Sequence, residues 1–157
     1  MNELTQEEWA SICGWLRAGE EVLWAGRGNR GGQADDASAV AGRKPSWWQR
    51  LCGRAERADV PATPPAAVAR ESVYVLLPTR VLELQGGCLQ QEWMLMLGMV
   101  QKVESHPDGS GNIVFDYEES ATGEKQPRGL LGIENVATVR DCLHAAIDAA
   151  YMASPWT

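Results

Sequence analysis

An amphipathic helix is predicted at each end of the chain. The first, over about residues 5 to 18, begins at Thr5, whose hydroxyl can cap a helix, and the second begins at Asn135 and runs to about Met152. Apolar residues recur at helical spacing in both segments: Trp9, Ile12, Cys13 and Leu16 in the first, and Val136, Val139, Leu143, Ile147 and Ala150 in the second. Such apolar faces are typical of helices that pack on a core.

Between the two helices, the pattern is that of short β-strands separated by turns. The sequence predicts strands over 21–25, 72–77 and 80–85 and an extended piece around 128–133. The apolar run over 92–104 is interpreted as two strand pieces broken near Gly98. After the turn at 107–111, Ile113, Phe115 and Tyr117 alternate with Val114, Asp116 and Glu118, which predicts a half-buried strand with Phe115 and Tyr117 on its buried face.

This order of elements predicts an α+β fold in one domain covering residues 1–157. Several antiparallel strands lie between two helices, and the chain is long enough to bury roughly 68 to 70% of the surface of its unfolded form. We expect Leu143 and Ile147 of the last helix to pack against Phe115 and the apolar face of residues 74–84. A long insertion, rich in glycine and proline, is predicted over about residues 27–70, after the first strand.

Charge is unevenly distributed along the chain. Residues 1–70 hold nine Lys/Arg and nine Asp/Glu, whereas residues 71–157 hold five and twelve, so the formal net charge of −7 lies in the second part. Because lysine and arginine supply most of the affinity for phosphate backbones, the sequence disfavours a nucleic-acid-binding function.

The sequence contains no recognisable catalytic or metal-binding motif. Its four cysteines, Cys13, Cys52, Cys88 and Cys142, form no CxxC pair, and we expect small buried apolar residues at these positions. The two histidines, His106 and His144, are interpreted as surface or packing residues. We therefore expect no enzyme activity, no metal and no cofactor. The polar N-terminus lacks the features of a signal peptide, which favours a cytoplasmic protein.

Several segments, in order, resemble the motifs of the bacterial pleckstrin-homology-like (PH-like) domain family. Residues 19–27 resemble the GEEVLWxGR segment at the entrance of many such proteins, 74–82 resemble their first hairpin, and 97–104 the segment that follows it. Residues 109–115 resemble the G-x-G-x-I-x-F strand, and 132–136 the approach to the last helix. The resemblance implies a strongly bent antiparallel β-barrel capped by a C-terminal helix, used in binding or assembly, with no catalytic residues.

One segment of the insertion differs from the rest of the chain. Residues 43–57 carry five basic residues and one acidic residue, a local charge of +4, together with two adjacent tryptophans. If Ser46 caps a short helix, the apolar and the basic side chains fall on separate faces. The candidate partner-binding residues are Arg43, Lys44, Trp47, Trp48, Arg50, Leu51, Arg54 and Arg57. The alternative is that the tryptophans pack on the barrel and the arginines are solvated.

The leading functional hypothesis is a protein-interaction module: an adaptor, an assembly component, or an inhibitor such as an immunity protein. An acidic barrel suits a basic protein partner, because charge complementarity accelerates encounter. The alternative is a peripheral membrane module that binds anionic lipid through the basic segment with its tryptophans. An enzyme with an unfamiliar site is the least favoured of the three classes.

Overall fold

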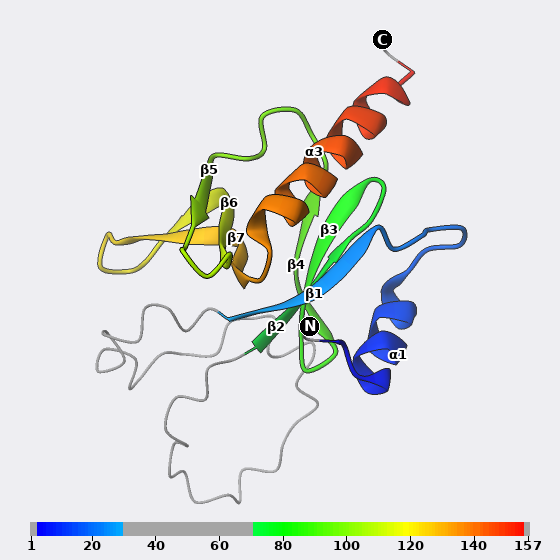
Figure 1. Ribbon diagram of the computed structural model, residues 1–157, viewed down its shortest axis with the longest axis horizontal. Helices are drawn as coiled ribbons and strands as arrows, with labels where there is room; N and C mark the ends of the chain where they lie inside the picture. The colour runs from blue at the N-terminus through cyan, green and yellow to red at the C-terminus, as the bar shows by residue number, and fades with distance from the viewer. Residues whose placement is uncertain (1–2, 30–70, 156–157) are drawn as a thin grey trace, which may run out of the picture.

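The computed structural model describes residues 3–29 and 71–155 (Figure 1). In chain order the described elements are α1 (Gln6–Trp15), β1 (Trp24–Asn29), β2 (Glu71–Leu76), β3 (Arg80–Gln85), β4 (Cys88–Met94), β5 (Lys102–Ser105), β6 (Gly111–Glu119), β7 (Lys125–Ile133) and α3 (Val136–Met152). The predicted α+β order, a helix followed by strands and a closing helix, is confirmed.

The described strands form one strongly curled antiparallel sheet in the order β4-β3-β2-β1-β7-β6-β5. α3 lies across the open side of this half-barrel, whereas α1 lies beside β1 on the other side (Figure 1). β1 therefore stands between the two helices, in the middle of the sheet.

The sheet buries apolar side chains on both faces. On the inner face, Tyr74, Leu76 and Phe115 belong to the same core cluster as α3. On the outer face, Val73, Val75 and Leu82 form a second cluster with Ile12 of α1. Successive residues of β2 thus point alternately to the two clusters, as the pleat of a strand requires.

The closing helix matches its predicted bounds and its predicted face. Leu143 is fully buried, and it lies with Ile147 in the cluster that contains Phe115, as expected. The N-cap is Asn135, but its side chain makes no capping hydrogen bond, so the expected capping chemistry is wrong. Asn135 instead adopts the left-handed conformation, with φ of 52°, which lets the chain turn sharply from β7 into the helix.

α1 has the predicted cap but a narrower buried face than predicted. Thr5 is the N-cap, as predicted, and the structure adds that Thr5 and Glu8 form a capping box. The helix ends at Trp15, and Ile12 is its buried residue. Trp9 and Cys13 are exposed, so the expectation of a buried thiol at this position is wrong. Cys88 and Cys142 are partly buried, and Cys52 lies outside the described residues.

The first strand lies later than predicted. It begins at Trp24 and runs to Asn29, so the predicted span of 21–25 is wrong and residues 27–29, assigned to the insertion, belong to the sheet. A side chain at Gly28 would place its Cβ 2.2 Å from the carbonyl oxygen of Leu131 and 2.4 Å from the ring of Tyr74. Glycine here lets β1 approach β7 closely. Because glycine has a low strand propensity, the local sequence predicts a loop at this position instead of a strand.

The two predicted strands at 72–77 and 80–85 form the expected hairpin. β4 begins at Cys88, earlier than the predicted position 92. Gly86 and Gly87, with φ of 57° and 80°, form a tight turn, so the next strand starts directly after the turn and pairs with β3. The predicted break near Gly98 is present, between β4 and β5.

The strand after the turn at 107–111 is present, but its burial pattern differs from the prediction. Ile113, Val114 and Phe115 are all buried, whereas Tyr117 is exposed. The register of β6 against β7 shifts twice, at 111–113 and at 114–116, which interrupts strict alternation. The expected burial of Tyr117 is therefore wrong.

Candidate functional site

A bidentate ion pair fastens α1 to β1. Arg27 Nε donates to Oε1 of Glu8 at 2.9 Å, and Nη2 donates to Oε2 at 2.8 Å. These hydrogen bonds hold the pKa of the Glu8 carboxyl at about 2, below its ordinary value of 4.5. Because Glu8 also closes the capping box with Thr5, one carboxylate both starts the helix and positions it on the strand.

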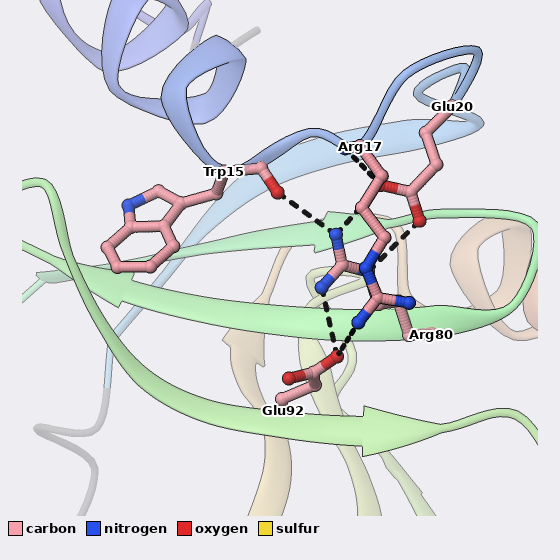
Figure 2. Close-up of polar contacts among 5 residues, drawn as sticks. All are labelled: Trp15, Arg17, Glu20, Arg80 and Glu92. Atoms are coloured by element: carbon pink, nitrogen blue, oxygen red, sulfur yellow. Dashed lines mark hydrogen bonds and ion pairs between the residues drawn. The ribbon is translucent and has the colours of Figure 1, made fainter.

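The connection after α1 is fixed by a second polar cluster around Arg80 (Figure 2). Arg80 of β3 is 5% exposed and donates two hydrogen bonds to Glu20, at 3.0 and 2.7 Å. It also donates to Glu92 of β4 at 2.9 Å and to the carbonyl of Trp15 at 2.9 Å. Hydrogen bonds from Arg80 lower the pKa of Glu20. One buried guanidinium thus ties the end of α1 and the turn before β1 to the sheet.

One edge of β1 loses its partner strand within the sheet. On its β2 side, β1 is paired along its whole length, from Trp24 to Asn29. On its β7 side, the described chain pairs with it only at Gly28, opposite Ile133. Continuing that antiparallel register would place residues 134–137 opposite residues 27–24, but the chain there turns at Asn135 into α3. Among residues 3–29 and 71–155, the edge from Trp24 to Arg27 therefore has no partner strand on this side, and we call it the open edge.

A groove of about 540 Å³ follows this open edge. Its floor is the edge from Trp24 to Arg27. One wall is the chain before α1 together with Trp9 of α1, and the other is the segment from Glu134 into the start of α3. The residues of the walls are Glu3, Leu4 and Trp9 on the α1 side and Glu134, Asn135, Thr138 and Val139 on the α3 side. We call this feature the tryptophan groove.

Two tryptophans give the groove its apolar surface. Trp9 is 42% exposed on α1, and Trp24 is partly buried against the inner core. The indole of Trp24 lies over Gly26, since a Cβ at that glycine would be 2.5 Å from the ring. Gly26 thus allows the ring to lie along the strand, and the groove offers two large aromatic surfaces on either side of a backbone edge.

A second cleft, of about 450 Å³, lies where α1 meets β2 and β3. Carboxylates of Glu7, Glu8 and Glu71 line it, and Val73 and Leu84 contribute from the sheet. Both apolar residues are buried, and β2 is paired on both of its edges. This cleft therefore offers less apolar surface and no open strand, and the tryptophan groove is the better candidate.

The candidate residues found in the sequence are not those of the groove. Residues Arg43, Lys44, Trp47, Trp48, Arg50, Leu51, Arg54 and Arg57 all lie outside the described residues, so their role stays a prediction. Trp9 and Trp24 were assigned to a packing face and to a strand. The available signal was the aromatic content of the first helix, which carries Trp9 and Trp15.

The described residues contain no group of three or more His, Cys, Asp or Glu side chains that could hold a metal ion. His106 and His144 are exposed, as expected. Across residues 3–29 and 71–155, no helix is both long and apolar enough to cross a membrane. Comparison with protein-family models gave no match, and comparison with curated proteins and with solved structures gave none either.

Proposed function

We propose that the chain is a non-catalytic protein-interaction module with a PH-like fold, and that it binds its partner through the tryptophan groove. The fold proposal is supported by the order of elements: seven described antiparallel strands in a curled sheet, followed by a C-terminal helix across the open side. This is the arrangement that the resemblance in the sequence implies. An adaptor, an assembly component and an inhibitor would each need such a binding surface.

The observation that carries the functional proposal is the exposure of Trp9 beside Trp24 in a groove of defined walls. A tryptophan left 42% exposed has much apolar area in contact with water, and burying it against a partner is favourable. Tryptophan is enriched among the residues that dominate binding energy at protein interfaces. The net charge of −7 favours a basic partner over an acidic one.

Photo-crosslinking in cells tests this proposal. A photoreactive amino acid replaces Trp9 in one variant and Trp15 in the other; the two tryptophans lie on the same helix and are 42% and 39% exposed. Trp15 does not line the groove. Its Nε1 donates to the carbonyl oxygen of Gly87 at 3.0 Å. We expect a discrete protein adduct from position 9 and none from position 15.

Equal labelling at the two positions, or no protein adduct at position 9, would contradict the proposal. A vesicle assay addresses the membrane alternative with the same variants. If the protein sediments with anionic vesicles and Trp9→Ala abolishes that sedimentation, the groove contacts lipid and the protein-interaction proposal is wrong.

A further inference from the structure

We infer that the tryptophan groove takes its partner as an added β-strand: an extended segment with basic and apolar residues that pairs with the open edge of β1. This inference rests on the proposed function and names the ligand class of that site. Its physical basis is the juxtaposition of an unpaired strand edge with two side walls in one groove.

The first argument is the backbone of β1. Between Trp24 and Arg27 the strand has a partner on its β2 side and none on its β7 side within the described chain. The N–H and C=O groups of an edge strand alternate in direction, so half of those in this stretch face the groove. Such an edge binds an extended peptide through main-chain hydrogen bonds, and pockets for alternate side chains give selectivity.

The second argument is that the two faces of β1 lead to different walls. Trp24 packs against the inner core with α3, whereas Ala25 packs against the outer cluster with α1. A strand added to this edge would present its own side chains alternately to the same two sides. Side chains that point toward α3 would meet the partly buried ring of Trp24, since Val139 of the same lining is 1% exposed.

The third argument is the charge of the α1 side. Glu3 and Trp9 lie there, and Arg27, the cation among the lining residues, is bound to Glu8. A lysine or arginine on the ligand could rest on the indole face of Trp9 with its charge toward Glu3. The α3 side also carries an acidic residue, because Glu134, which is exposed, lines the groove just before Asn135. Carboxylates therefore stand on both sides of the groove, and the ligand that fits it contains basic residues together with apolar ones.

Selection from random linear peptides displayed on phage tests this inference. The wild-type protein is the target, and Thr138→Trp is used for counter-selection, because Thr138 is an exposed residue of the groove wall and a large ring there fills the space. His144→Trp, an exposed position of α3 outside the groove lining, is the matched control. Enriched peptides are synthesised and measured by calorimetry, each also in a form methylated on alternate backbone amides.

We expect enriched peptides to contain basic and apolar residues and to be depleted in acidic ones. Thr138→Trp should weaken their binding at least about tenfold, and His144→Trp should leave it unchanged. Methylation of the amides that face β1 should also weaken binding about tenfold or more, because the main-chain hydrogen bonds are lost and the methyl groups clash with the edge. The comparison of methylated with unmethylated peptides uses only the wild-type protein. It therefore tests the inference even if Thr138→Trp does not fold.

Three outcomes would overturn the inference. If methylated and unmethylated peptides bind equally and Thr138→Trp blocks both, the groove binds side chains only; the proposed function then stands without strand addition. If no peptide distinguishes wild type from Thr138→Trp, no extended ligand uses the groove, and crosslinking at Trp9 decides the proposed function separately. If sedimentation shows a dimer that Thr138→Trp dissociates, the occupant is a second copy of the chain.

Discussion

The two helices at the ends of the chain show similar periodicity but attach to the sheet in different ways. α3 buries five apolar residues in the inner core: Val136, Val139, Leu143, Ala146 and Ile147. α1 buries Ile12 and is held by the Glu8–Arg27 ion pair and, at its end, by the Arg80 cluster. α3 thus packs on the core along one whole face, whereas α1 packs mainly through Ile12 and is also fixed by charged hydrogen bonds.

The difference explains why the groove is available for recognition. The ion pair at Glu8 and the Arg80 cluster hold α1 in place, while Trp9 of the same helix stays 42% exposed at the groove. Hydrogen-bonded charges also fix the helix at a specific position, since bidentate arginine–carboxylate pairs have narrow geometry. α1 therefore contributes an exposed aromatic side chain to the groove, whereas α3 contributes both to the core and, through its first turn, to the other groove wall.

The largest effect is expected from the apolar helix. Leu143→Ala removes a fully buried side chain and should lower the free energy of unfolding by about 2 to 5 kcal/mol. His144→Ala, the exposed neighbour, should change it by less than about 0.5 kcal/mol. Denaturant unfolding of both variants measures this. A loss below about 0.5 kcal/mol for Leu143→Ala would show that α3 is not part of the core.

The next largest effect is expected at Arg80. Arg80→Met leaves Glu20 and Glu92 without their buried cation, and breaking a buried pair in this way costs about 3 kcal/mol. The control is Arg140→Met, whose partner Asp141 is exposed; its loss should be below about 1 kcal/mol. Equal losses for the two variants in urea unfolding would show that the Arg80 cluster is as weak as a surface pair.

The clamp at Glu8 predicts a dependence of stability on pH. The pKa of Glu8 is about 2 in the folded chain, below its ordinary 4.5, so its contribution is complete above about 4.5 and is lost as the pH falls toward 2. Glu8→Gln should therefore flatten the fall in melting temperature between pH 5 and 2, while Glu7→Gln, an exposed neighbour, should follow the wild type. Parallel curves for wild type and Glu8→Gln would contradict this assignment.

The smallest effect on stability is expected from Trp9 itself. Trp9→Ala should lower the free energy of unfolding by less than about 1 kcal/mol, because the side chain is 42% exposed. Trp93→Ala, which truncates a ring that is 8% exposed and packs edge-to-face on Phe115, should cost about 3 to 5 kcal/mol. Similar losses for the two variants would place Trp9 in the core and remove it from the binding surface.

Much of the fold could be predicted from local patterns. The C-terminal helix, the hairpin at 72–85 and the strand after 107–111 carry strong periodic or turn signals, and all three are present. The first strand was misplaced because Gly26 and Gly28 weaken strand propensity, while the close approach of Leu131 and Trp24 requires them. That requirement is a tertiary contact, which the local sequence does not contain.

The groove could not be predicted for a related reason. The floor of the groove is an unpaired strand edge because the pairing of β1 with β7 ends where Asn135 turns the described chain into α3. This relation joins residues more than 100 positions apart, and a single sequence gives no information on strand pairing at that distance. Trp9 was therefore assigned to a packing face, although the structure leaves it at the groove wall.

The most direct test of the open edge and its use is hydrogen exchange of the amides from Trp24 to Arg27, with and without a selected peptide. In the free protein, we predict that the amides facing the groove exchange fast, while those bonded to β2 exchange slowly. When the peptide binds, the fast amides should become protected. Slow exchange of all of them in the free protein, or unchanged fast exchange in the complex, would contradict the account.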